Sequence, residues 1–455
     1  MSMSQSNPLV PQQVVELDVS ALVSDGRGLG RREGMAVFVE GALPGQRVRA
    51  RIVRTRKRMA EAELVEILVP SEDENEPPCP HAGLCGGCPW QGLPYVRQLE
   101  WKARIVRDAL QRVGGIENPL ILDILPSPET WRYRNKMEFA FGRTEEGGIV
   151  LGLRERGSRA VVSVTGCLLQ SPLTMRVLEA VRGLVLEQAE LAARCRFLVV
   201  REPHAGGCFV ELILGPDAAK GNDTLLGERF AALLRSVVAG VSGFALSLRS
   251  APGDVAYGET IAYADGEIRE RIAGVELVLG PASFFQVNTP AAELLYAEVA
   301  RLCRLEELND PTVWDVYGGI GSIGFSLARH MRGGRLIGVE EMPGAVRYAR
   351  MNADILGLRR YRMESGDARS VLGRLIRQAP PDVVVVDPPR AGLDARVVQQ
   401  LVKASPRRIL YVSCNPATLA RDVARLSPAF RLRTVRPVDL FPQTPHVESV
   451  ALLEP

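Results

Sequence analysis

Apolar and polar positions alternate most regularly in the C-terminal part of the chain. Short apolar runs with the composition of buried strands recur there, at Val313–Val316, Arg335–Val339, Arg360–Met363, Asp382–Val386, Arg408–Val412 and Leu432–Leu440. A stretch with a helical pattern, Ala291–Leu302, precedes them, and further helical stretches separate them. Strands that alternate with helices indicate βαβ units and a parallel sheet. We therefore predict an α/β domain over residues 280–455.

The N-terminal part has a different pattern. Apolar residues gather in four short segments separated by glycines, at Val14–Val19, Met35–Val39, Gln46–Val53 and Glu61–Leu68. Short strands with turn signals between them indicate an all-β unit. A small OB-like β-barrel over residues 1–70 fits this pattern.

The middle of the chain begins after an acidic linker closed by prolines, Ser71–Pro78. A helix is predicted over Gln98–Val113. Strands are predicted over Trp131–Arg143, Ile149–Leu153 and Ala160–Val164. The order of the later elements, up to Leu279, does not follow from the pattern. We predict an α+β central domain over residues 71–279.

Composition limits the class of protein. The 455 residues are 46% hydrophobic and carry a net charge of +3, so two or three domains with real cores are expected. Any affinity for nucleic acid must then come from local patches. No apolar run reaches the roughly 18 residues that a membrane helix needs. We expect a cytoplasmic protein that binds no membrane, and the sequence indicates no obligate protein partner.

One predicted strand has a high density of positive charge. Seven of the twelve residues from Arg47 to Arg58 are Lys or Arg, and Arg47, Arg49 and Arg51 alternate along the strand. Alternate residues project from one face, which suits contacts with nucleic-acid phosphates. The alternative is an edge strand whose charges serve only solubility.

A single cysteine lies where a predicted buried strand turns into a helix. Cys414 follows Arg408–Val412 and precedes Asn415 and Pro416, which suit an N-cap and a first helical position. This turn lies at the carboxyl edge of the sheet, where ligands bind, and a helix N-terminus favours a thiolate. We predict a nucleophile with a lowered pKa at Cys414. The alternative is a small buried core residue.

A glycine-rich turn follows the first strand of the α/β domain. Asp315 and Tyr317 precede it, and Glu340 ends the next strand, 23 residues after Tyr317. The glycines at 319, 321 and 324 match the G-x-G-x-x-G of nicotinamide-dependent dehydrogenases, which is one interpretation. An acid two residues before Tyr-Gly-Gly-Ile-Gly is more similar to the first motif of S-adenosylmethionine methyltransferases. A tight turn without a ligand is the remaining alternative.

Three further polar residues fit a cofactor site in this domain. Asp387 ends the strand Asp382–Val386, where a carboxylate has no packing role. Arg390 stands where amine-methylating enzymes have an aromatic residue in a related motif, which argues against methylation of an exocyclic amine. Asp367 ends another strand and could approach the adenosine. Gln286 lies at the start of the domain, before its first strand, and could bind the methionine end of the cofactor.

Three cysteines within ten residues indicate a metal site. Cys79, Cys85 and Cys88 follow the linker, and a fourth ligand is needed. The candidates are Cys167, Cys195, Cys208 and Cys303, of which the last three lie in apolar stretches and suit a core. The spacing fits either a structural zinc ion or an iron–sulfur cluster.

Five ordered motifs together resemble one family. They are Phe284–Asn288, Asp315–Gly321, Asp387–Arg390, Ser413–Pro416 and Phe441–Glu448. With an N-terminal segment that resembles a TRAM domain and with the cysteine cluster, they resemble the uracil-C5 RNA methyltransferases of the 23S ribosomal RNA type. The resemblance covers nearly the whole chain. It implies a TRAM barrel, a cluster-bearing central domain and a Rossmann-like methyltransferase domain.

The resemblance also implies roles for individual residues. The nucleophile falls on Cys414 and the general base on Glu448. S-adenosyl-L-methionine and a [4Fe-4S] cluster are the implied cofactors, and 23S ribosomal RNA is the implied partner. The cofactor contacts fall on Gln286, Tyr317, Ser322, Glu340, Asp367 and Asp387, and the cluster ligands on Cys79, Cys85, Cys88 and Cys167. Many members have cysteine where this chain has Gly318, and some have asparagine at Ser322.

The residues suit this chemistry. Uracil C5 is a poor nucleophile, so a thiolate must first add at C6, and a base must later remove the C5 proton. Glu448 shares one face of a predicted strand with Val450 and Leu452, and an apolar wall would raise its pKa. His446 is either a structural hydrogen-bonding residue or a participant. A non-catalytic RNA-binding factor is the rival from another class, and intact Cys414 and Glu448 argue against it.

Overall fold

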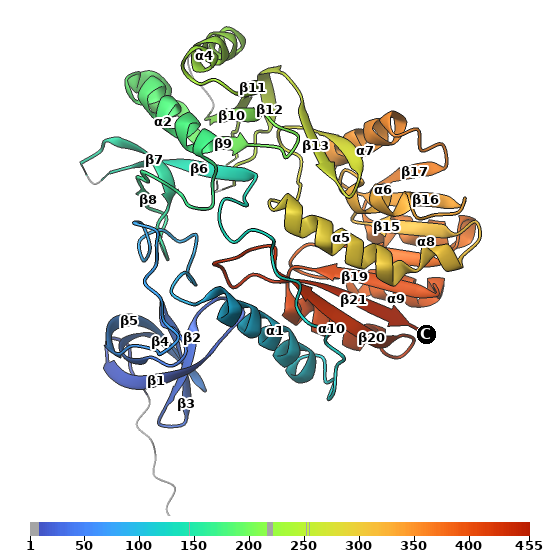
Figure 1. Ribbon diagram of the computed structural model, residues 1–455, viewed down its shortest axis with the longest axis horizontal. Coiled ribbons are helices and arrows are strands. Elements are labelled where there is room, and N and C mark those ends of the chain that lie inside the picture. The colour runs from blue at the N-terminus through green and yellow to red at the C-terminus, as the bar shows by residue number, and fades with distance from the viewer. Residues whose placement is uncertain (1–8, 145, 216–221, 252, 254) are drawn as a thin grey trace, which may run out of the picture.

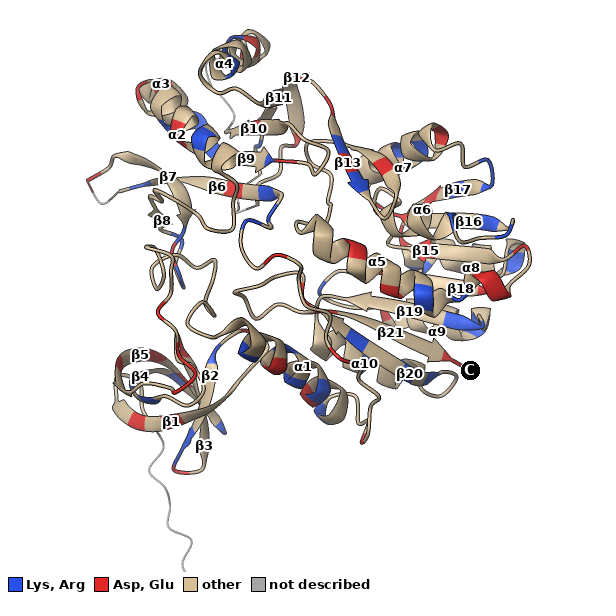
Figure 2. Cartoon of the chain, viewed as in Figure 1, with Lys and Arg blue, Asp and Glu red and all other residues tan. Residues whose placement is uncertain are grey.

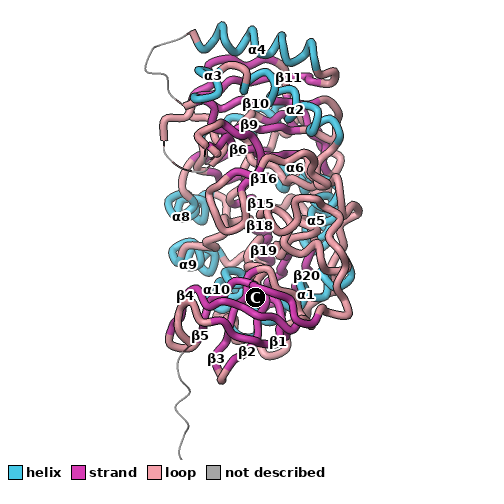
Figure 3. Tube along the Cα trace, turned by 90° about the vertical axis from the view of Figure 1, so that its left-hand side faces the viewer, coloured by secondary structure: helices cyan, strands magenta, loops and turns pink. Residues whose placement is uncertain are grey.

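A computed structural model describes residues 9–144, 146–215, 222–251, 253 and 255–455. The chain forms a barrel, a central sheet and a large C-terminal sheet (Figure 1). Viewed from the side, the strands of the central sheet, the C-terminal sheet and the barrel follow one another from top to bottom (Figure 3). No helix in these ranges is long and apolar enough to cross a membrane.

Five strands close the N-terminal barrel in the order β1-β2-β3-β5-β4. Apolar residues alternate along them, so one face fills the interior with Val15, Leu17, Val48 and Ile52 among others. Gly30 has no room for a side chain, because a Cβ there would lie 2.4 Å from the Asp18 carbonyl oxygen. The predicted OB-like barrel is confirmed, and the strand it missed is β2. The strands are β1 (Val14–Leu22), β2 (Gly28–Arg32), β3 (Met35–Glu40), β4 (Arg47–Arg56) and β5 (Met59–Val69).

The central sheet has seven strands in the order β12-β11-β10-β9-β6-β7-β8. Only β10 and β11 pair in parallel, because α4 connects them, and the other pairs are antiparallel. The predicted α+β character is confirmed. The strands are β6 (Lys136–Arg143), β7 (Ile149–Arg154), β8 (Val161–Val162), β9 (Cys195–Arg201), β10 (Cys208–Leu214), β11 (Val241–Leu248) and β12 (Thr260–Asp265). The helices are α2 (Pro172–Leu186), α3 (Ala189–Arg194) and α4 (Asp223–Val237).

The C-terminal sheet has seven strands in the order β17-β16-β15-β18-β19-β21-β20. The first five are parallel, and β21 runs antiparallel to both neighbours. The strands are β15 (Thr312–Val316), β16 (Arg335–Glu340), β17 (Tyr361–Ser365), β18 (Val383–Val386), β19 (Arg408–Ser413), β20 (Arg431–Val438) and β21 (Glu448–Glu454). A hairpin of β13 (Ile268–Ile272) and β14 (Val275–Leu279) precedes them.

Helices cover both faces of this sheet, as Figure 3 shows. Alternate strand residues face opposite layers, so Val313 and Val385 pack on the side of α5, while Trp314 and Val386 pack on the side of α8 and α9. The predicted Rossmann-like fold is confirmed. The helices are α5 (Thr289–Cys303), α6 (Ser322–Ala328), α7 (Pro343–Ile355), α8 (Ala368–Gln378), α9 (Ala395–Ala404) and α10 (Pro416–Leu426), with a 3-10 turn at Leu305–Glu307.

One helix of the predicted central domain packs on the C-terminal sheet. Val106 and Leu110 of α1 (Tyr95–Arg112) share a core with α10, and the chain that follows bridges Ile121 to Val435 of β20. We propose three domains, over residues 1–70, 71–279 and 280–455. Helix α1 belongs to the central domain by sequence and completes a helical layer of the C-terminal domain.

Candidate functional site

The chain leaves β15 in a tight turn. Tyr317 (φ 64°), Gly319 (φ 57°) and Gly321 (φ 91°) have left-handed backbones. A tyrosine in this conformation is strained, and such strain is typical of functional turns. The Gly319 N–H donates to Glu340 Oε2 at 3.0 Å, which joins the ends of β15 and β16. A side chain at Gly319 would meet nothing within 4 Å, so the turn opens onto free space.

A cavity lies beside this turn, at the carboxyl ends of the parallel strands. Its lining includes Tyr317, Glu340 and Asp367, three of the six predicted cofactor residues. The strand order reverses between β15 and β18, which is where open α/β sheets bind ligands. Asp367 also caps α8, since its carboxylate accepts from the Arg369 N–H at 2.8 Å.

Asp315 is a buried carboxyl next to the turn. Its Oδ2 accepts from the Gly324 N–H at 3.0 Å, whereas Oδ1 has no hydrogen-bond partner in the described part of the chain. Burial raises the pKa of Asp315 to about 7. An unpartnered carboxylate oxygen beside an open glycine turn suits a cation such as the ammonium group of S-adenosylmethionine. The residues present therefore fit this cofactor.

Ser322 and Asp387 belong to a second group. Ser322 Oγ lies 2.8 Å from the hydroxyl of Tyr296, a buried residue of α5. Burial, and after it Asp387, Asp315 and Glu448, raises the Tyr296 pKa well above its usual value. Tyr296 was not predicted, because the pattern of one tyrosine on an apolar helix face indicates a core residue.

Gln286 comes from another part of the chain, the segment between β14 and α5. It is buried just before α5, and its carbonyl accepts from Asn135 Nδ2 at 3.0 Å. Among the described residues, its side chain makes no hydrogen bond to the other predicted cofactor residues.

The strand register brings Cys414 and Glu448 to the same end of the sheet. Ser413 of β19 pairs with Ser449 of β21. Because the two strands are antiparallel, the residue after Ser413, Cys414, and the residue before Ser449, Glu448, lie at the same end. Asp387 follows β18, the parallel neighbour of β19. The Arg390 carbonyl accepts from Asn415 Nδ2 at 3.0 Å, which ties the two loops together.

Glu448 is only 5% exposed. Burial, and then Asp387, raises its pKa to about 8, while Arg390 lowers it. This is the direction expected for a carboxylate against an apolar wall. Burial and Asp315 raise the Asp387 pKa to about 7.

The predicted low pKa of Cys414 is wrong for the ligand-free protein. Burial, and after it Glu448 and Asp387, raises the pKa of this thiol, and Arg390 lowers it, with a net result of about 11. The helix N-terminus of α10 is present, with Asn415 as its cap. The partial positive charge of this helix end is opposed by the carboxyl groups of Glu448 and Asp387, which are distant from Cys414 in the sequence.

His446 packs as a neutral ring. Burial, and then Arg390, lowers its pKa to about 4. The ring lies edge-on to Phe441 with centroids 5.9 Å apart, and Nδ1 is 3.4 Å from an Arg390 nitrogen. These contacts favour the structural role among the two considered.

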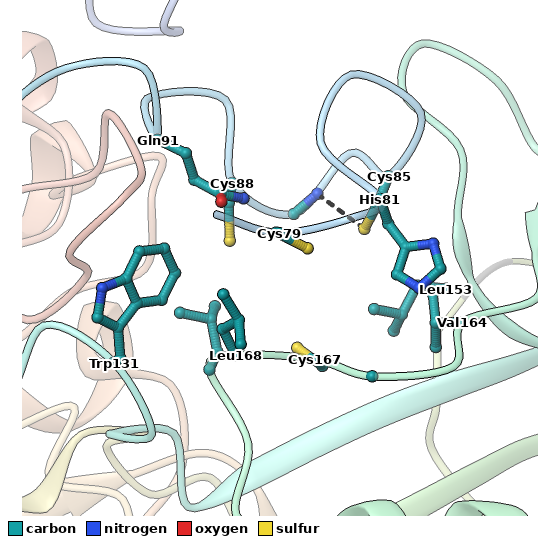
Figure 4. A pocket seen from close by; sticks show the side chains of 13 residues that line it. Cys79, His81, Cys85, Cys88, Gln91, Trp131, Leu153, Val164, Cys167 and Leu168 are labelled. Carbon is teal, nitrogen blue, oxygen red and sulfur yellow. Dashed lines mark hydrogen bonds between the residues drawn. The ribbon is translucent and has the colours of Figure 1, made fainter. Parts of the chain in front are cut away.

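The four cysteines of the predicted cluster line one cavity (Figure 4). Cys79, Cys85 and Cys88 come from one loop, and Cys167 faces them from the segment after β8. Burial, and then the other three thiols, raises the Cys88 pKa to about 12. The other three cysteines, Cys195, Cys208 and Cys303, are buried in apolar cores, as predicted.

No three His, Cys, Asp or Glu side chains of the described residues form a group placed to hold a metal ion. Four sulfurs around one zinc ion would each lie about 2.3 Å from it. A [4Fe-4S] cluster needs the four cysteine sulfurs further apart, because each sulfur binds a different iron atom. Four thiols around one mainly apolar cavity are a ligand set that either group could use.

The structure changes the interpretation of the basic strand. Acidic and basic residues are interspersed over the barrel (Figure 2). Arg47 and Arg49 both pair with Glu16, and Arg51 lies 3.9 Å from Glu63. The alternating face is therefore largely neutralised by neighbouring strands. In the described residues, Arg54, Lys57 and Arg58 form no ion pair, and these are the cations that remain for phosphates.

Comparisons with known proteins identify what the chain is similar to. Residues 373–455 match the family model of tRNA (uracil-5-)-methyltransferase, and residues 11–65 match that of the TRAM domain. An uncharacterized RNA methyltransferase of Nitratidesulfovibrio vulgaris is 44% identical over 453 residues, which cover 96% of this chain and 95% of the relative. One of Gloeobacter violaceus is 36% identical over 460 residues, or 98% and 97% of the two chains.

A solved structure shares the architecture. The crystal structure of Pyrococcus abyssi tRNA (uracil-54, C5)-methyltransferase in complex with S-adenosyl-L-homocysteine is 27% identical, with a TM-score of 0.75. The match covers 96% of this chain and all of that one. The doubly wound sheet, the glycine turn and the TRAM barrel thus define an S-adenosylmethionine-dependent RNA methyltransferase. More narrowly, the chain belongs to the uracil-C5 RNA methyltransferase family. The dehydrogenase interpretation is thereby excluded.

Proposed function

We propose that this enzyme methylates C5 of a uridine in 23S ribosomal RNA through a covalent adduct between Cys414 and C6. The observation that supports it most is the register of β19 and β21, because it puts a thiol and a buried carboxyl at one end of the sheet. A cysteine and a carboxylate are the two groups that C5 methylation requires. We propose the cytoplasm, where ribosomal RNA is made and assembled in bacteria, as its location.

Cys414 begins the reaction by adding to C6, which makes C5 nucleophilic. S-adenosylmethionine, when bound, supplies the methyl group that C5 takes. Glu448 then removes the C5 proton, and the sulfur leaves as the ring is restored. Asp387 and Arg390, which both affect the pKa values of Cys414 and Glu448, set the charge of the site.

The cofactor would be held by six residues in this proposal. Tyr317, Glu340 and Asp367 line the cavity that suits the adenosine. Ser322 shares a hydrogen bond with Tyr296, whose pKa is raised by burial and then by Asp387 and Asp315, so this group suits the methionine end. Gln286, just before α5, is the sixth residue.

We further propose that Cys79, Cys85, Cys88 and Cys167 hold a [4Fe-4S] cluster. The support is the single cavity that all four cysteines line, since such a cluster is held by four cysteine thiolates. A zinc ion is the alternative. Iron and sulfide analysis of anaerobically purified protein separates the two, since zinc would give a colourless protein with no visible absorption.

Transfer RNA is the second candidate substrate. It is favoured by the substrate of the Pyrococcus abyssi enzyme, a transfer RNA, because that enzyme has a similar fold. Mass-spectrometric mapping of 5-methyluridine in both RNA classes, with and without the gene, distinguishes them. Loss of a methylated uridine from 23S ribosomal RNA supports the proposal, and loss confined to transfer RNA contradicts it.

A further inference from the structure

The connection between β20 and β21 carries His446 and leads to Glu448, and it leaves the sheet to reach the chain before α1 (Figure 1). The ends of this connection are paired, Val438 with Glu448. The segment between them therefore depends on contacts made elsewhere.

Gln443 is the best-anchored residue of that segment. It is buried and has a left-handed backbone (φ 71°), a strained conformation for a non-glycine residue. Its N–H donates to Gln98 Oε1 at 2.8 Å, and its side-chain oxygen accepts from Gln98 Nε2 at 2.9 Å. Its carbonyl accepts from the Trp90 N–H at 3.0 Å.

Lys102 holds the beginning of the same segment. Its ammonium donates to Asp439 Oδ1 at 2.5 Å and to the Phe441 carbonyl at 2.9 Å, and both charged side chains are fully buried. Tyr133 adds a hydrogen bond to the Pro442 carbonyl at 3.0 Å. Each of these partners lies more than 300 residues earlier in the chain.

Trp90 extends the network to the cysteine loop and the barrel. It stands two residues after Cys88, and its indole N–H donates to the Gly26 carbonyl at 3.2 Å. Gln98 Nε2 also donates to the Trp90 carbonyl at 3.2 Å and to the Leu93 carbonyl at 2.9 Å. One glutamine thus joins α1, the cysteine loop and the segment before Glu448.

We propose that Gln98 and Lys102 are positioning residues that hold the segment Asp439–Glu448, and with it the base, in the active site. The proposal rests on the proposed role of Glu448. Its consequence is a particular defect: without these anchors the nucleophile stays in place on β19 while the base is displaced.

Gln98→Glu tests this proposal with little change of side-chain volume. It replaces the donor Nε2 by an oxygen acceptor, which then faces the acceptor oxygens of Trp90, Leu93 and Gln443. Gln111→Glu is the matched control, since Gln111 is an exposed glutamine of the same helix that donates to the Glu117 carbonyl. Hydrogen exchange of the free protein should be about tenfold faster in residues 439–448 of Gln98→Glu, with β15 and β16 unchanged. Exchange equal to that of the control would overturn the proposal.

Gln443→Gly is the second variant, in case Gln98→Glu does not fold. Glycine tolerates the left-handed backbone and removes only the side-chain half of the clamp. Exchange in residues 439–448 should then rise by about threefold. Unchanged exchange in this variant would also contradict the anchoring.

Adduct formation separates this inference from the proposed function. With S-adenosylmethionine and RNA from a strain that lacks the gene, Gln98→Glu should accumulate the RNA–protein adduct that Glu448→Gln accumulates. An adduct in Glu448→Gln with normal turnover in Gln98→Glu overturns only the positioning role. Normal turnover in Glu448→Gln overturns the role of the base, while hydrogen exchange still decides the anchoring.

Discussion

Cys414 has three charged neighbours that act on its pKa in different directions. After burial, Glu448 and Asp387 raise the pKa, and Arg390 lowers it, with a result of about 11. At neutral pH the free enzyme therefore carries a thiol. A cationic cofactor beside the carboxyls would oppose their effect, so we expect the thiolate to form mainly in the loaded site.

Alkylation of Cys414 should follow these neighbours. The rate with iodoacetamide should rise about tenfold per pH unit between pH 7 and 10, because only the thiolate reacts. Glu448→Gln removes a negative charge and should speed alkylation at pH 8, whereas Arg390→Gln should slow it. Mass spectrometry reports the site, with buried Cys208 as an internal control. Slower alkylation in Glu448→Gln would contradict this electrostatic account.

Two glycines in helices should respond oppositely to alanine. A Cβ at Gly324 would lie 2.6 Å from Asp315 Oδ2, so Gly324→Ala should displace this carboxylate and weaken S-adenosylhomocysteine binding at least about tenfold. Gly183 in α2 is exposed and a Cβ would meet nothing within 4 Å, so Gly183→Ala should stabilise the protein by roughly 0.5–1 kcal/mol. Titration calorimetry measures the binding and scanning calorimetry the stability, and unchanged binding in Gly324→Ala would exclude Asp315 from the cofactor site.

The cysteine loop should contain iron. Anaerobically purified protein should be brown, and Cys167→Ala should lose the iron, because a cluster needs four thiolates. Cys195→Ala is the control, since Cys195 is buried in the central core and should leave the iron content unchanged. Stoichiometric zinc in the wild-type protein would contradict the assignment of an iron–sulfur cluster.

Most single elements were predictable because their signals are local. The apolar run before Asp387 and the cap at Asn415 predicted β18 and α10 to within a few residues. What escaped prediction depends on partners distant in sequence. Examples are Tyr296 beside Ser322, the glutamates that pair with Arg47 and Arg49, and the carboxyls that raise the Cys414 pKa.

At the scale of the whole molecule, pairing order was the main unknown. The parallel pair β10 and β11 within a mainly antiparallel sheet, and α1 on the C-terminal sheet, follow from long-range packing. The period of apolar residues along a strand determines which face of the strand is buried, but it does not indicate which other strand pairs with it.

The barrel should add salt-sensitive RNA affinity through the end of its β4–β5 hairpin. Neutralising Arg54, Lys57 and Arg58 should reduce the slope of log affinity against log salt by about 2 to 3, because each phosphate contact contributes about 0.7–0.9. Arg47→Gln with Arg49→Gln should change it less, since both arginines already pair with Glu16. Equal slopes in all three proteins would show that the barrel makes no phosphate contacts there.

The central claim, that Cys414 and Glu448 act at opposite ends of one covalent pathway, is tested most directly by denaturing electrophoresis of enzyme mixed with RNA and S-adenosylmethionine. Glu448→Gln should accumulate a methylated RNA–protein adduct, because methyl transfer proceeds and the C5 proton stays. Cys414→Ala should give neither adduct nor product. An adduct that persists in Cys414→Ala, or normal turnover in Glu448→Gln, would contradict the account.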